Sequence, residues 1–154
     1  MDRKELLLTP LAYMPPPRLL AGLEPDESAR VVPGASHSIV EILAHLAFWQ
    51  SWFIDRCAGN AKPMVARASE GWPPAGAEDW LTLRAQFLAD LQRAAEWPGD
   101  GPVAPAIEAP GMAHYTVSEA LTHLAVHNAH HLGQVVTMRQ VLGAWPPPDG
   151  SWTW

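Results

Sequence analysis

The stretch Thr116 to Gln134, TVSEALTHLAVHNAHHLGQ, decides the fold of this chain. It begins like a helix, because Thr116 can cap the first free amides and Glu119 can reach back to complete a capping box. Inward-facing residues then recur at intervals of three and four, which predicts a long helix with one buried face, ended by Gly143. The residues of this face are Val117, Leu121, Leu124, Asn128, His131, Val135, Met138 and Leu142.

The inward side of this helix carries a pair of histidines. His127 and His131 are four residues apart, so they lie about 40° from each other around the helix and about 6 Å apart along its axis. Two imidazoles in this relation can bind one transition-metal ion. His123 extends the series, but it lies about 12 Å from His131 along the axis, too far to share an ion. This helix therefore supplies two ligands, and a third must come from elsewhere.

Three other histidines are candidates for the third ligand. We favour His45, because it lies inside a second expected helix beside Leu46 and Trp49, where a rigid element can hold it. His37 and His114 remain open alternatives, and both fall in expected loops just before helix starts.

The remaining pattern predicts an all-α protein. A second long helix begins with a capping box at Ser38 and Glu41 and ends near Gly59. A third is expected over Glu78 to Trp97, where Pro98 stops it. The apolar face of the second contains Ile39, Ile42, Leu43, Leu46, Trp49, Phe53 and Cys57, and that of the third contains Trp80, Leu83, Phe87, Leu91 and Ala94.

The segments between these helices are rich in proline and glycine. The N-terminal part reads as one or two short helices interrupted by prolines, with Arg18 to Leu23 the better helix. Glu24 to Gly34 and Gly99 to His114 are expected loops. Asn60 to Gly76 is long for a connection in a small domain, so we expect it to cover a site. The tail, Ala144 to Trp154, carries three tryptophans that should anchor it to the body.

Composition limits the class of protein. A chain of 154 residues suits a single domain, here residues 1–154 with the tail 144–154 packed on it. The net charge of -6, with few and scattered basic residues, argues against a nucleic-acid partner. One cysteine, Cys57, suits a reducing interior and a core position. With neither a signal-peptide pattern nor a membrane-spanning apolar run, we expect a cytoplasmic protein.

Other metal-site patterns fit less well. A zinc-protease helix needs Glu after its first histidine, where Asn128 stands. Di-iron bundles place Glu and His three apart, whereas Glu41 and His45 are four apart. No GxSxG motif indicates a serine hydrolase. Gly133 is costly inside a helix, so we expect it to permit a close approach beside the site.

These residues resemble a known family. The segment HNAHHLGQ, together with a histidine in the helix SIVEILAHL, is similar to the DinB-like superfamily of four-helix metalloproteins, and the ending LGAWPPPDGSWTW is also similar. Leu132 stands where relatives often have Arg, which argues against a role for a cation there. The positions that match the family pattern are His45, His127, His131, Gly133 and Gln134.

The resemblance implies a fold and a site. It implies a four-helix bundle of up-down-down-up topology, frequently a homodimer, that binds zinc, nickel or a similar divalent ion such as manganese, iron or magnesium. The metal ligands would be His45, His127 and His131. Trp49, His123, Asn128 and Gln134 would line the pocket or support the ligands.

The resemblance also implies candidate reactions, since characterised relatives include transferases and isomerases that use the thiols bacillithiol or mycothiol. We expect open metal positions to hold water at rest and a low-molecular-weight thiol in turnover, with the thiolate attacking a small electrophile in a tryptophan-walled pocket. A metal-dependent hydrolase is the alternative among enzymes. A non-catalytic metal-binding or stress-response dimer, and a metal-free bundle whose histidines fill space, are the alternatives outside catalysis.

Overall fold

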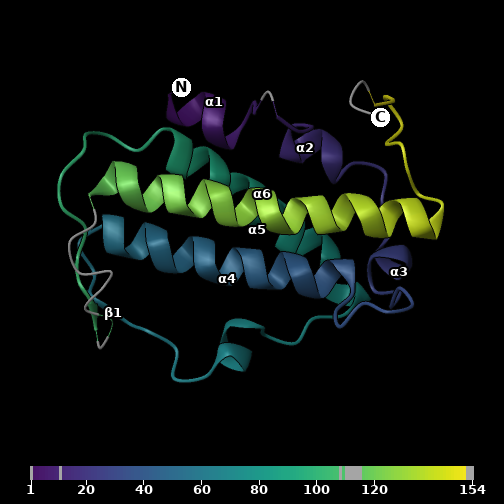
Figure 1. Ribbon diagram of the computed structural model, residues 1–154, viewed down its shortest axis with the longest axis horizontal. Coiled ribbons are helices and arrows are strands. Elements are labelled where there is room, and N and C mark those ends of the chain that lie inside the picture. Colours follow the sequence, from purple (N-terminus) through teal and green to yellow (C-terminus); the bar gives the residue numbers. More distant parts are fainter. Residues whose placement is uncertain (1, 11, 108, 110–115, 152–154) are drawn as a thin grey trace.

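Three long helices form the body of the protein. The computed structural model describes residues 2–10, 12–107, 109 and 116–151. The long helices are α4 (Ile39–Cys57), α5 (Trp80–Ala95) and α6 (Val117–Leu142). Figure 1 shows α4 and α6 side by side and running in opposite directions, with α5 behind them. Because α4 packs against both of the others, it is the central element of the bundle.

The ends of the helices follow the expected local chemistry. Ser38 and Glu41 form a capping box on α4, and Thr116 and Glu119 form one on α6. In each box the carboxylate of the glutamate accepts the backbone N–H of the capping residue, at 2.7 Å in α4 and 2.8 Å in α6. Gly143 ends α6 in the left-handed conformation, at φ 73°, as predicted.

The core lies where the three long helices meet. Phe87 of α5 is fully buried, and its backbone carbonyl accepts a hydrogen bond of 2.7 Å from the Gln50 amide of α4. The Trp80 indole is also fully buried and donates to the Leu23 carbonyl at 2.9 Å, which connects α5 to the N-terminal segment. Most residues of the three predicted apolar faces are buried. The exceptions are the partly exposed Trp49, Cys57, Leu83 and Leu142.

The N-terminal segment contains three short helices: α1 (Arg3–Leu7), α2 (Pro16–Leu19) and α3 (Pro25–Ser28). The expectation of a helix over 18–23 was misplaced, because prolines at the first turn start α2 earlier. The expected loop over 24–34 also contains a helical turn, α3, which has its own capping box. Most described residues that form regular structure are helical, so the all-α prediction holds. The first helix, α1, packs on α5 and α6, and the up-down-down-up topology stays a prediction.

The connections between the long helices contain short elements that the sequence did not indicate. A parallel pair of two-residue strands, β1 (Lys62–Pro63) and β2 (Ala106–Ile107), joins the loops after α4 and before α6. A 3₁₀ helix, η1 (Ala68–Gly71), lies in the long connection from α4 to α5, and another, η2 (Ala77–Asp79), leads into α5. The third helix therefore begins two residues later than predicted.

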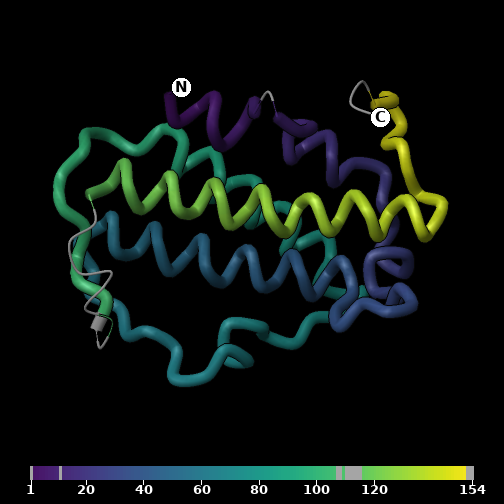
Figure 2. The backbone as a smooth tube through the Cα atoms, in the orientation of Figure 1, coloured from purple at the N-terminus to yellow at the C-terminus, as the bar shows by residue number. Residues whose placement is uncertain are grey.

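The C-terminal tail returns to the N-terminal segment. Figure 2 shows both segments on the same side of α6. Arg139, almost fully buried, donates to the Ala144 carbonyl at 3.0 Å and to the Leu19 carbonyl, with its guanidinium over the Trp145 ring. Trp145 is partly buried against the core, whereas Trp152 and Trp154 lie outside the described residues, so the anchoring of the tail stays a prediction. Within the described part of the chain, the structure contains no helix with the length and apolar character needed to cross a membrane.

The burial of Phe87 generates a prediction about stability. We expect Phe87→Ala to lower the free energy of unfolding by about 3–5 kcal/mol, because it leaves a cavity between α5 and α4. Urea unfolding followed by circular dichroism measures this loss. The control is Leu81→Ala on the same helix, where the side chain is 63% exposed and the expected change is within about 0.5 kcal/mol. Equal losses in the two variants would contradict the packing described.

Candidate metal centre

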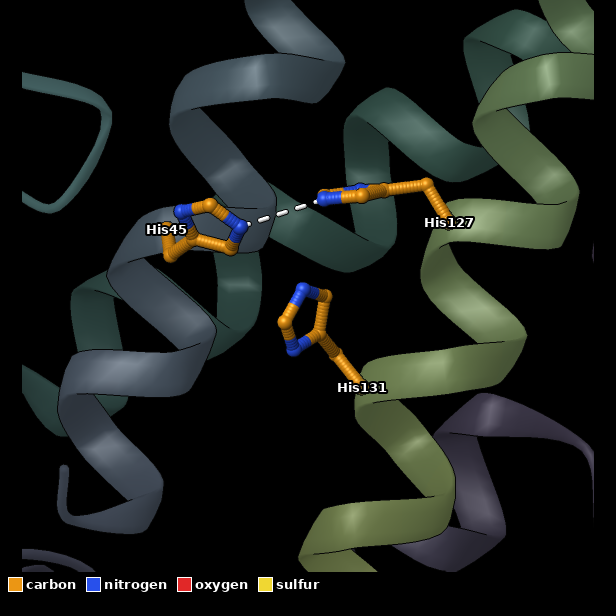
Figure 3. A group of neighbouring side chains, drawn as sticks. All are labelled: His45, His127 and His131. Atoms are coloured by element: carbon orange, nitrogen blue, oxygen red, sulfur yellow. Dashed lines mark hydrogen bonds between the residues drawn. The ribbon is translucent and has the colours of Figure 1, made fainter. Parts of the chain in front are cut away.

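Three imidazoles from two helices converge between α4 and α6. His45 comes from α4, and His127 and His131 come from successive turns of α6, so their rings face one another across the helix interface (Figure 3). Each ring offers one nitrogen, and the three nitrogens lie within 4.8 Å of one another. Among the described residues, no carboxylate or thiol belongs to this group. This is the grouping expected from the spacing of His127 and His131 together with the choice of the helical His45 as third member.

The backbone of the long connection fixes the orientation of the His45 ring. Its Nδ1 lies 2.6 Å from the carbonyl oxygen of Gly71, in η1. A carbonyl only accepts, so the proton of the neutral ring must lie on Nδ1, and the Nε2 lone pair is free. That Nε2 faces Nε2 of His127 at 3.1 Å. The connection thus holds His45 in the tautomer that a metal ion requires.

The other two rings differ in their support. Nδ1 of His131 lies 2.8 Å from Oε1 of Gln134, one turn further along α6. If Nδ1 donates to this oxygen, Nε2 of His131 also presents a lone pair to the centre. Nδ1 of His127 is buried and has no hydrogen-bond partner among the described residues. Among the described residues, His127 is oriented by its place on α6 and by ring contacts with His45 and His131, at 5.0 and 4.7 Å between centroids.

Burial lowers the pKa of all three rings and so favours their neutral form. Desolvation lowers the pKa of His45 to about 4, with further lowering by the nearby His131 and His37 and an opposing effect of the Gly71 carbonyl. Desolvation and then the neighbouring histidines lower the pKa of His127 to about 4 as well. The pKa of His131 is lowered mainly by desolvation. Neutral imidazole is the form that binds metal, so the site does not need to lose protons near neutral pH.

The separation of the donors fits a single ion. Two nitrogens bound to one zinc ion at about 2.0–2.1 Å in tetrahedral geometry stand about 3.3 Å apart. The 3.1 Å between Nε2 of His45 and Nε2 of His127 is close to this value. Three neutral imidazoles and no further protein donor among the described residues correspond to a site that leaves a position open, as catalytic zinc sites do.

A tryptophan from the long connection covers one side of the centre. The ring of Trp72 stacks on His45 with 3.7 Å between ring centroids, and its other face stacks on His37 at 3.9 Å. His37, which the sequence left open as a third ligand, therefore packs behind Trp72 and does not join the three imidazoles. Trp72 and Gly71 were not predicted individually, although the connection that carries them was expected to cover a site.

Four residues were expected to line the pocket or support the ligands, and the structure places some of them beside the three histidines and others elsewhere. Trp49 lies edge-on to His45 with 6.4 Å between centroids, and His123 lies against Phe53 at 5.2 Å. Asn128 is buried and donates to Gln50 at 3.3 Å, on the core side of α6. Gln134 contacts His131 as described above.

Three further expectations have mixed outcomes. Gly133 is exposed, and a Cβ added there would meet nothing within 4 Å, so the expectation of a close approach was wrong. Cys57 is half-buried, and burial raises the pKa of its thiol to about 11, which fits an unreactive residue. His114 lies outside the described residues.

The comparison with family models agrees with this geometry. A model of the DinB superfamily matches residues 17–135, which contain all three histidines. The chain belongs to the DinB superfamily. No curated protein and no solved structure matches it significantly.

In this DinB-superfamily chain, two separate pockets each reach one of the α6 histidines of the centre. A pocket of about 620 Å³ includes His131 and Trp72 in its lining, together with residues near the C-terminal end of α6. A pocket of about 290 Å³ is lined by Trp49, Phe53, Met64, His123 and His127. We name them the His131-side pocket and the His127-side pocket. His131 therefore borders the first pocket and His127 the second, while His45 is in the described lining of neither.

The first prediction for this site concerns metal content. We expect His45→Ala, His127→Ala and His131→Ala each to lose most of the bound divalent metal, because two imidazoles hold an ion far more weakly than three. Elemental analysis of the purified proteins after dialysis measures the metal-to-protein ratio. The control is His130→Ala, an exposed neighbour whose loss should leave the ratio unchanged. Unchanged metal in any of the three ligand variants would remove that residue from the site.

The second prediction concerns pH. The pKa of His45 and His127 lies near 6.5 in the unfolded chain and about 4 in the folded protein. Between these values the unfolded chain takes up protons that the folded protein does not, so stability falls as the pH drops from 6.5 towards 4. Urea unfolding with a chelator present, at several pH values in this window, measures the loss. The double variant His45→Gln/His127→Gln should show a smaller dependence, and an identical one would contradict the lowered pKa values.

Proposed function

We propose that this protein is a metal-dependent enzyme that transfers a small electrophilic substrate onto a low-molecular-weight thiol. The observation that carries the proposal is the group of three imidazoles. In the described part of the chain no other protein donor joins this group. Two of its members, His131 and His127, each line a pocket. Closed structural zinc sites use four protein ligands. An open three-histidine site therefore favours catalysis over a purely structural role.

The donor set limits the ion. Imidazole nitrogens suit zinc, nickel, copper and iron, whereas magnesium and manganese prefer oxygen ligands. We therefore propose zinc or nickel as the resident ion, held by His45, His127 and His131. When bound, a divalent ion of this kind stabilises the thiolate form of a thiol over the thiol form.

The protein's contribution to the reaction is to orient the ligand rings and to cover one side of the metal centre. The Gly71 carbonyl and the Gln134 amide hold two of the ligand rings, and Trp72 shields the face of His45. In the transfer, the sulfur electron pair forms a bond to carbon of the electrophile, the leaving group departs with its own electron pair, and the thiol proton passes to solvent. The half-buried thiol of Cys57, whose pKa burial raises to about 11, is no competing nucleophile.

The hydrolase alternative has less support. A hydrolase gains from a carboxylate or similar base beside its water. Among the described residues, neither pocket has Asp or Glu in its lining.

Three finer points belong to the same proposal. We propose that α1 and α2 together take the place of the first helix in the up-down-down-up bundle that the family resemblance implies. We further propose that the protein forms a homodimer and acts in the cytoplasm. Sedimentation analysis of the purified protein tests the homodimer. A single monomeric species would contradict it.

The test of the function uses cobalt-loaded protein. Addition of 2-mercaptoethanol should produce a sulfur-to-cobalt charge-transfer absorption, and the loaded protein should accelerate conjugation of a thiol with 1-chloro-2,4-dinitrobenzene. We expect His127→Ala to lower this rate by about two orders of magnitude or more, because a few kcal/mol of stabilisation are lost. His130→Ala is the control and should keep the rate. Cobalt binding without thiol absorption or turnover would favour a non-catalytic metal-binding protein.

A further inference from the structure

The described lining of the His131-side pocket is mainly apolar. Among the described residues that form it, none is Asp, Glu, Lys or Arg, and most are apolar. The polar groups it offers are neutral hydroxyls and an amide, from Ser36, Thr137 and Gln134, and the imidazoles of His37 and His131. Away from the metal centre, a carboxylate or phosphate in this space would lose hydration without meeting a Lys or Arg side chain of the described lining. The lining therefore favours an uncharged molecule.

This pocket is continuous with the candidate metal centre. His131 belongs both to the three imidazoles and to the pocket wall, and Trp72 stacks on His45 while it also lines the pocket. From His131 the wall extends along α6 through Gln134, Thr137, Met138 and Val141. A molecule with its donor atom at the centre can therefore lay the rest of its body along this wall.

The size of the pocket limits the occupant. A volume of about 620 Å³ lies within the range of about 300–1,000 Å³ that is usual for small-molecule sites. The His127-side pocket, at about 290 Å³, is less than half as large and shares none of the described lining residues. The two pockets can therefore hold different reactants, and the larger body belongs on the His131 side.

We propose that the His131-side pocket binds the body of an uncharged, mainly apolar reactant, with an aromatic or alkyl tail along α6 and its donor atom at the three histidines. The inference rests on the proposed function in one respect, the presence of a metal ion at the centre. It adds the substrate class: reactants with carboxylate or phosphate tails are selected against on this side. Thr137 and Met138 are the residues that contact the tail.

The test compares metal-binding probes that differ only in their tails. Imidazole, 4-phenylimidazole and imidazole-4-acetate share one donor head, and the last two carry an apolar and an anionic tail. Their binding to cobalt-loaded protein is followed by the visible absorption of the ion, so neither thiol chemistry nor turnover enters the readout. We expect 4-phenylimidazole to bind at least about tenfold more tightly than imidazole, since burial of a phenyl ring contributes more than about 1.4 kcal/mol. Imidazole-4-acetate should bind no more tightly than imidazole.

Three lysine variants locate the tail. Thr137→Lys places a cation on the wall of the His131-side pocket and should weaken 4-phenylimidazole several-fold while strengthening imidazole-4-acetate. Thr82→Lys is the matched control, because it makes the same exchange at another exposed helical threonine, on α5, outside both pockets. Met64→Lys tests the His127-side pocket. Neither Thr82→Lys nor Met64→Lys should alter the preference between the probes.

Each outcome has a defined consequence. Equal affinities for the three probes, or a preference abolished by Met64→Lys and not by Thr137→Lys, would overturn the assignment of the pocket and leave the proposed function standing. A wild-type protein that takes up no cobalt would overturn both. A selective apolar preference that Thr137→Lys reverses, in a protein without thiol conjugation, would support the pocket and contradict the transferase.

Discussion

Nε2 of His45 and Nε2 of His127 lie 3.1 Å apart across the interface of α4 and α6, and the Gly71 carbonyl requires the first of these atoms to present a lone pair. Such a contact is stable only when a proton or a cation lies between the two nitrogens. Desolvation lowers the pKa of both rings and favours their neutral form. In that form, either Nε2–H of His127 donates to Nε2 of His45, or a metal ion takes the place of that proton. This contact links α4, α6 and the connection from α4 to α5, whose Gly71 carbonyl orients His45.

The long helices and the three candidate ligands could be predicted because both depend on helical periodicity. A capping box, a spacing of three and four and a terminal glycine are local signals, and the structure bears them out at Ser38, Thr116 and Gly143. The same periodicity placed His127 and His131 on one face. The choice of His45 over His37 needed only the argument that a ligand is best held on a rigid helix.

What the sequence could not give depends on tertiary contacts. Trp72 and Gly71 lie in a connection without periodicity, so nothing local indicates that one stacks on His45 and the other accepts its proton. The expectation for Gly133 was wrong because a helical glycine suggests a close neighbour, and the fold places none within 4 Å of an added Cβ. The turn α3 was missed because a helix of four residues leaves too short a pattern.

The connection from α4 to α5 links the site to its environment. Its β1 strand pairs with β2, its η1 helix orients His45, and Trp72 separates His37 from the three imidazoles. An added Cβ at Gly71 would meet the Trp49 indole at 2.9 Å, so this residue is confined between α4 and the site. The connection is therefore part of the site, as expected of a segment that covers one, and its Trp72 lines the His131-side pocket.

X-ray absorption spectroscopy at the edge of the bound metal tests the central claim most directly, because it counts the imidazoles around the ion. For the zinc-loaded protein we predict three imidazole nitrogens at about 2.0–2.1 Å, with the remaining scattering from oxygen or another light exogenous donor. A shell with one imidazole or none would contradict the convergence of His45, His127 and His131 on a single ion.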